Sequence, residues 1–132
     1  MTVCSSLLCA FVSGCSRQTP VENFLADFTG PSAINCGRFR ALAALDANVE
    51  KAMACTVLAR KERKAFYVIN EDETFDSQIA SGFVGKADGN AMLFYYDSAP
   101  CGGPHCRSSF SLKQCAAPRA KKERNIVEMV CE

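Results

Sequence analysis

The sequence contains no tryptophan and only one histidine, His105. Its formal net charge is +1, so it lacks the basic excess that favours nucleic acid, and we predict no nucleic-acid partner. It also lacks the glycine-rich phosphate loop and the dinucleotide-binding fingerprint. No internal repeat or low-complexity segment divides it. Cysteine, by contrast, is abundant, with 9 in 132 residues.

The first apolar run, residues 3–12, carries no charge. It is too short to cross a bilayer as a helix, which takes about 20 residues, but it has the length of the apolar part of an export signal. It ends in Val12-Ser13-Gly14-Cys15, where an aliphatic residue and two small residues precede a cysteine. This tetrapeptide resembles the lipobox of bacterial lipoproteins.

The resemblance implies that the signal is cut before Cys15 and that the Cys15 sulfur carries a diacylglycerol lipid, with acyl chains such as palmitate. Two or more buried acyl chains hold a protein stably on a membrane. Ser16 follows the cysteine, which under the enteric sorting rule favours the outer membrane over the inner membrane. We therefore expect a bacterial cell-envelope protein that faces the periplasm. The alternative is a cytosolic domain in which residues 3–12 are buried.

The length of the chain favours one domain. We predict a signal peptide at residues 1–14, a lipidated anchor and tether at 15–32, and a single domain at 33–132. Within the tether, residues 23–29 are either a short helix or irregular. Gly30-Pro31-Ser32 is a loop signal that separates the tether from the domain.

One segment has helical periodicity. Residues 47–64 contain no glycine or proline, and one apolar stripe recurs there at helical spacing, made of Val49, Ala52, Met53, Cys55, Val57 and Ala59. Asp46 is suited to cap the first turn of this helix. Further along, Asp88-Gly89 is typical of a tight hairpin between two strands. The strands that we expect are residues 66–69, 79–86, 91–96, 108–114 and 126–131, with turns or loops at 70–76, 98–104 and 118–124.

A helix followed by consecutive strands predicts an α+β fold. We expect one main helix packed on an antiparallel sheet of about four to five strands. Of the 9 cysteines, three (Cys4, Cys9 and Cys15) fall in the predicted signal and anchor, which leaves an even number for pairing. In an oxidising compartment these would staple the domain with disulfides.

The disulfides that we expect are Cys36–Cys55, Cys101–Cys106 and Cys115–Cys131. Two glycines and a proline between Cys101 and Cys106 favour a tight loop that brings these two sulfurs together. Sequence alone permits other pairings of six cysteines. Two alternatives to the disulfides are free thiols and a zinc site made of Cys101, His105, Cys106 and Cys115.

The residues that could carry chemistry do not form a catalytic set. His105 precedes Cys106, but a cysteine nucleophile also needs a group that orients its base and an oxyanion site. The acidic cluster at residues 71–76 lacks the spacing of an EF-hand calcium loop. We therefore predict no catalytic residue, no cofactor and no metal.

Adjacent tyrosines, Tyr95 and Tyr96, lie just before the cysteine loop. Side chains alternate along a strand, so one tyrosine should face away from the side that the helix covers. With Pro100 and His105 they form a candidate interaction loop, since an exposed tyrosine is typical of interfaces. The alternative is that the tyrosines pack beneath the loop.

These observations favour a non-enzymatic binding or accessory module of the envelope. Its predicted partners are the membrane, through the lipid, and another envelope protein. Two other classes stay open, an envelope enzyme or inhibitor and a cytosolic zinc or thiol protein. The sequence does not indicate the oligomeric state.

Overall fold

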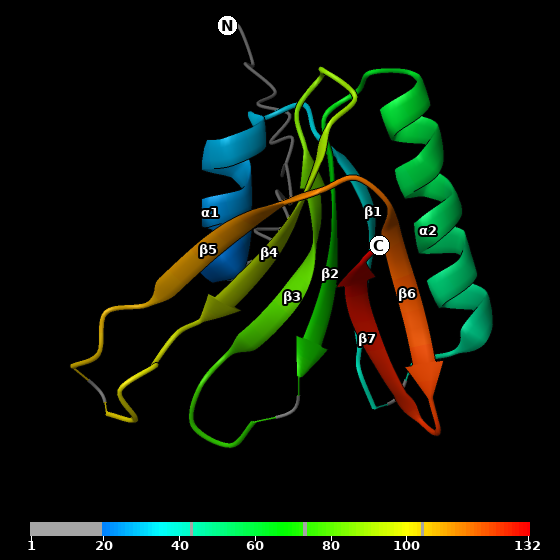
Figure 1. Cartoon of the computed structure of the whole chain (residues 1–132). Helices are drawn as coiled ribbons and strands as arrows, with labels where there is room; N and C mark the ends of the chain where they lie inside the picture. Colours follow the sequence, from blue (N-terminus) through cyan, green and yellow to red (C-terminus); the bar gives the residue numbers. More distant parts are fainter. Residues whose placement is uncertain (1–19, 43, 73, 104) are drawn as a thin grey trace, which may run out of the picture.

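The computed structural model describes residues 20–42, 44–72, 74–103 and 105–132 (Figure 1). Within these ranges lie two helices, α1 (Pro20–Thr29) and α2 (Asp46–Lys61). The strands are β1 (Ile34–Arg40), β2 (Phe66–Asp72), β3 (Ile79–Gly85), β4 (Ala91–Asp97), β5 (Ser109–Cys115), β6 (Pro118–Glu123) and β7 (Ile126–Cys131). The first five form one sheet in the order β1-β2-β3-β4-β5, and β6 and β7 form a separate two-stranded sheet. The predicted α+β class is confirmed, although the structure has a second helix and more strands than we expected.

The large sheet is mixed, not wholly antiparallel as predicted. β1 runs parallel to β2, whereas β2, β3, β4 and β5 pair antiparallel. Parallel neighbours need a long crossover connection, and α2 supplies it between β1 and β2. β1 is not evident as a strand in the sequence, because a bulge between Asn35 and Gly37 interrupts the alternation of inward and outward side chains.

α1 packs on one face of the large sheet (Figure 1). Val21 and Leu25 are fully buried there, in a cluster with Ile69, Phe94 and Tyr96. Their i, i+4 spacing puts both side chains on the same face of the helix. α1, which lies within the segment expected to be a tether (residues 15–32), therefore packs on the sheet.

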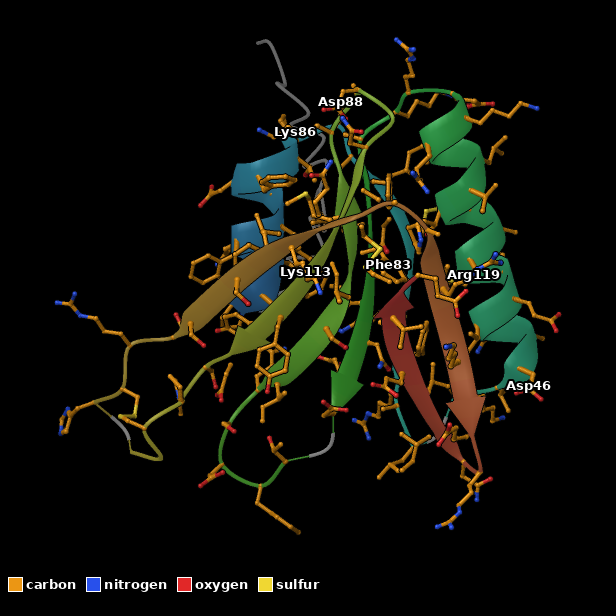
Figure 2. All side chains as sticks on the ribbon, in the orientation of Figure 1. Asp46, Phe83, Lys86, Asp88, Lys113 and Arg119 are labelled. Atoms are coloured by element: carbon orange, nitrogen blue, oxygen red, sulfur yellow. A yellow bond between two sulfur atoms is a disulfide. The ribbon has the colours of Figure 1, made fainter. Side chains whose placement is uncertain are left out.

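α2 and the β6–β7 hairpin cover the opposite face of the sheet (Figure 1). The residues of α2 that are buried, Ala52, Thr56 and Ala59, are all small. Apolar side chains of β2, β3 and β7 fill the space between these layers, and Figure 2 shows Phe83 of β3 within it. The large sheet is thus the middle of three layers, with an apolar cluster on each of its faces.

The prediction of a turn or loop at residues 118–124 is wrong, because this segment contains β6. Four of the six residues of β6 are charged, which made it resemble an exposed loop. It pairs antiparallel with the apolar β7, where Ala120 lies opposite Met129. Arg119 and Lys121 also form ion pairs with Glu132, at 3.6 Å and 2.9 Å. Tertiary pairing has overridden a weak local preference for strand.

α2 begins where the sequence predicts, but Asp46 is not its capping residue. Leu45 occupies the N-cap position with an extended backbone and no side-chain hydrogen bond, and Asp46 is the first helical residue. The Asp46 carboxylate forms an ion pair with Lys122 of β6. Asp46 therefore links the beginning of α2 to the hairpin beside it.

The predicted hairpin between β3 and β4 is confirmed. In its connection, the Asp88 carboxylate accepts a hydrogen bond from the backbone N–H of Asn90 at 2.9 Å. Gly89 has a φ of +83°, which glycine adopts at little cost. These two residues are the turn signal that the sequence shows.

Candidate binding surfaces

Three disulfide bonds join the described cysteines in the predicted pairs. The Cα–Cα distances are 5.4 Å for Cys36–Cys55, 5.6 Å for Cys101–Cys106 and 5.4 Å for Cys115–Cys131. Because each of these sulfurs is bonded to another, the alternative zinc site cannot draw its ligands from them. Nor does the described part of the chain gather three or more His, Cys, Asp or Glu residues in a metal-binding arrangement.

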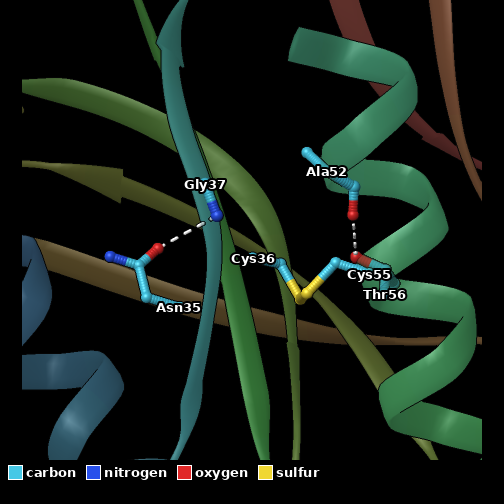
Figure 3. The surroundings of a disulfide bond; sticks show 6 residues. All are labelled: Asn35, Cys36, Gly37, Ala52, Cys55 and Thr56. Carbon is cyan, nitrogen blue, oxygen red and sulfur yellow. Dashed lines mark hydrogen bonds between the residues drawn. A yellow bond between two sulfur atoms is a disulfide. The ribbon is translucent and has the colours of Figure 1, made fainter.

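The bulge in β1 directs Cys36 toward α2 (Figure 3). The side-chain oxygen of Asn35 accepts a hydrogen bond from the backbone N–H of Gly37 at 3.0 Å. Gly37 has a φ of +137°, and a Cβ atom built on it would lie 3.5 Å from the Cβ of Ala52. Glycine therefore suits the unusual backbone at this position, and the disulfide ties the edge strand to the middle of α2.

The loop between β4 and β5 projects from the rest of the fold (Figure 1). Pro100 and His105 are exposed on it, and the Cys101–Cys106 disulfide closes it. Within the loop, the backbone N–H of Gly103 donates a hydrogen bond to the Cys106 sulfur at 3.2 Å. The loop borders a cavity of about 400 Å³. It is a covalently closed surface loop, as the sequence predicts.

The two tyrosines lie on opposite faces of the sheet and do not form one patch. Tyr96 is 1% exposed and packs against Phe24 of α1, with ring centroids 5.6 Å apart. Burial raises the pKa of Tyr96, and the residue has no surface to offer a partner. Tyr95 is 46% exposed on the other face. Of the predicted interaction loop, only Tyr95, Pro100 and His105 are accessible.

A cluster of charged side chains links α1 to the sheet and was not predicted from the sequence. Arg38 of β1 forms an ion pair with Glu22 of α1 at 3.2 Å and another with Glu71 of β2. Gln78 also donates a hydrogen bond to the Glu71 carboxylate, at 2.8 Å. The hydrogen bond from Arg38 holds the pKa of Glu71 below its usual value. These groups hold one another in place, which is a structural role.

An apolar hollow runs between α2 and β6. It has a volume of about 630 Å³, and its floor and walls include Val49, Met53, Val57, Leu58 and Ala120. Val57 is 61% exposed and Leu58 54% exposed. α2 therefore buries its small residues against the sheet and leaves Val57 and Leu58 exposed, while Val49 and Met53 pack at the edge of the core cluster. We call this hollow the α2–β6 groove.

The charges around the α2–β6 groove are unevenly distributed. Its lining includes the cations Lys61 and Arg119 and a single acid, Glu50. Figure 2 shows Arg119 on β6 beside the middle of α2, and Asp46 where the helix begins. Arg119 forms an ion pair with Glu132, and Lys64, beyond Lys61, forms one with Glu62. Lys61 and Arg63 therefore leave an excess of positive charge near the C-terminus of α2.

Three residues that line this groove, Val49, Met53 and Val57, belong to the apolar stripe that the sequence shows on α2. The whole stripe, which was expected to cover the sheet, consists of Val49, Ala52, Met53, Cys55, Val57 and Ala59. Ala52 and Ala59 are buried against the sheet, and Val49, Met53 and Cys55 pack at the edge of the same cluster, whereas Val57 is exposed. Small side chains permit the close approach of α2 to β1.

The predicted lipidation site, Cys15, lies outside the described residues. Neither described helix has the length and apolar character that would let it cross a membrane. Comparison of the chain with protein-family models, with curated proteins and with solved structures found no match.

Proposed function

We propose that the protein is a non-enzymatic binding module of the bacterial cell envelope, held on the outer membrane by acyl chains on Cys15 and facing the periplasm. The lipobox-like segment Val12–Cys15 supports the anchor. The three disulfides support an oxidising compartment, since such bonds form and persist there and are rare in the cytosol.

The α2–β6 groove is the proposed partner site. The observation that carries this proposal is the exposure of Val57 and Leu58 along a groove while small residues of the same helix are buried. Exposed apolar patches of this kind mark interaction sites. The groove lies along one helix, and its length suits an amphipathic helix laid beside α2.

The proposed occupant is an acidic amphipathic helix of an envelope protein. Its apolar face would cover Val57 and Leu58, and its carboxylates would lie near Lys61 and Arg119. Complementary charge of this kind speeds encounter and fixes orientation more than it adds affinity. A basic helix with the same apolar face would be repelled at this end of the groove.

The intact mass of the protein from its native membrane tests the anchor. The expected species begins at Cys15, carries acyl chains, and has lost two hydrogens for each of the three disulfides. A chain that begins at Met1 without acyl chains would overturn the lipoprotein proposal. A mass that shows reduced cysteines would overturn the oxidising compartment.

Two synthetic helical peptides test the groove. They share a leucine face and differ only in flanks of glutamate or lysine. We expect the glutamate peptide to bind the domain about tenfold more tightly at low salt. The double variant Val57→Ser/Leu58→Ser should abolish binding, and Lys61→Glu should remove the preference for the acidic peptide.

The matched control is Phe75→Ser, which removes an exposed aromatic residue that does not line the groove. It should leave binding unchanged. Equal binding of the two peptides, or loss of binding in the Phe75 variant but not in the Val57/Leu58 variant, would overturn the proposal. Pro100→Ser/His105→Ser in the same assay tests whether the disulfide-closed loop contributes.

A further inference from the structure

A second cavity lies on the sheet face that α2 and β7 share, away from the groove. Its volume is about 330 Å³, and β2, β3, β4 and β7 all contribute to it. Its lining includes Asn70, Asp72, Ser81, Leu93, Tyr95 and Ile126. None of them lines the α2–β6 groove.

Asn70 is the buried polar residue of this cavity. It is 2% exposed, and its side-chain amide donates a hydrogen bond to the carbonyl oxygen of Val127 at 3.1 Å. Its side-chain oxygen is buried and accepts no hydrogen bond from the described residues. A buried acceptor without a donor costs about 1–3 kcal/mol. A ligand that brings a donor into the cavity would recover that loss.

The register of the sheet aligns polar groups beside Asn70. Asn70 lies opposite Ser81 on β3, and Ser81 lies opposite Tyr95 on β4. These cross-strand neighbours point to the same face of the sheet. Tyr95 is half-exposed, so its ring and hydroxyl are available at the open side of the cavity.

The charges that line the cavity are all negative. Asp72 and Glu128 belong to the lining, and no Lys or Arg belongs to its described part. Glu128 is exposed and alternates along β7 with the buried Val127 and Met129. Asp72, two residues after Asn70 on β2, shares the sheet face of Asn70. Burial raises the pKa of the Asp72 carboxyl, which a nearby cation would oppose.

We propose that this cavity binds a primary ammonium group, carried by a lysine side chain or by a free alkylamine. Its three N–H donors match the acceptors of Asn70 and Asp72, and the Tyr95 ring offers a cation–π contact. Leu93 and Ile126 supply apolar surface for the methylene chain. A sugar would satisfy Asn70 but would leave the negative charge of the cavity unanswered.

The test compares two probes that differ in the ammonium group alone. Nα-acetyl-lysine methylamide and its norleucine analogue are titrated into 15N-labelled protein, and amide shifts are followed. We expect the lysine probe to shift residues around Asn70, Ser81 and Tyr95 with a Kd of about 1 mM. The norleucine probe should leave them unchanged. n-Butylamine is titrated as a third probe. It carries the ammonium group without the backbone amides of the lysine probe, so it distinguishes binding of a free alkylamine from binding of a lysine residue.

Variants then locate the binding. Asp72→Asn and Tyr95→Ala should each weaken the lysine probe about tenfold, whereas Tyr95→Phe, which keeps the ring, should bind as the wild type does. Asp76→Asn is the matched control, because Asp76 is an acid outside the cavity. Thermal unfolding of each variant separates lost binding from lost fold.

Equal shifts from the norleucine probe would overturn the proposal. So would shifts confined to α2 and β6, binding that survives both Asp72→Asn and Tyr95→Ala in folded protein, or preferential binding of N-acetylglucosamine at these residues. Shifts confined to α2 and β6 would place the probe at the α2–β6 groove, and the other outcomes do not bear on that groove, so the two proposals can fail independently.

Discussion

The side-chain amide of Asn70 donates a hydrogen bond to the carbonyl oxygen of Val127, 3.1 Å away. This bond joins the large sheet to the β6–β7 hairpin. A second bond, from the Val127 N–H to the Ala41 carbonyl oxygen at 3.0 Å, holds the same point of β7 to the chain that follows β1. Val127 is therefore held through both its backbone N–H and its backbone carbonyl oxygen.

We predict that Asn70→Leu lowers the free energy of unfolding by about 2 kcal/mol, because it leaves the Val127 carbonyl oxygen buried without its donor. Urea unfolding followed by circular dichroism measures the change. The matched variant Asn23→Leu, on the exposed side of α1, should change stability by less than about 0.5 kcal/mol. Equal effects of the two substitutions would contradict this account of Asn70.

The close approach of β2 and β4 to Gly82 gives a second prediction. A Cβ atom on Gly82 would lie 1.9 Å from the Val68 carbonyl oxygen and 2.8 Å from a ring carbon of Phe94. Gly82→Ala should therefore destabilise the fold by about 3 kcal/mol or more. At Gly103 a Cβ would meet nothing within 4 Å, so Gly103→Ala should leave the melting temperature nearly unchanged.

The packing of α1 gives a third prediction. Leu25 is fully buried against the sheet, so Leu25→Ala should reduce the free energy of unfolding by about 3 kcal/mol. Asp27→Ala, two residues along on the exposed side, serves as the control. If both variants unfold at the wild-type urea concentration, residues 20–29 behave as the tether that the sequence suggested.

Stability should also depend on pH through Glu71. Arg38 lowers the pKa of Glu71 in the folded protein, so the ionised carboxylate stabilises the fold. This contribution is complete above the pKa of glutamate in the unfolded chain and is lost as the pH falls through the lower folded-state value. The pair is partly exposed, so we expect about 1 kcal/mol.

The measurement is urea unfolding of the wild type and Glu71→Gln at pH 7 and pH 3. The wild type should be the more stable at pH 7, and the difference should shrink at pH 3. A difference that stays constant would mean that the Arg38–Glu71 ion pair does not contribute.

Much of the fold follows from local signals. Asp88-Gly89 fixed the β3–β4 hairpin because its backbone requirements are specific. The three cysteine pairs were predicted because each joins segments that the helix, the glycine loop or the last strands bring together. The turn is a short-range constraint and the disulfides are covalent ones. Both depend on residue types that can be recognised in a single sequence.

The rest depends on contacts between distant segments. β6 is a strand because β7 pairs with it, not because its charged residues favour extended structure. The predicted apolar stripe of α2 was divided, with Ala52 turned toward the sheet and Val57 toward solvent. The hydrogen bond that the Asn70 side chain donates depends on the position of Val127, 57 residues later in the chain.

The Cys115–Cys131 disulfide joins the end of β5 to the end of β7 and encloses the whole β6–β7 hairpin. A protease that cut the chain at the hairpin tip would release no fragment, since both new ends would stay attached through this bond. The scission would be visible on a reducing gel and invisible on a non-reducing one. The domain therefore keeps its last strand after a single cut at the hairpin tip.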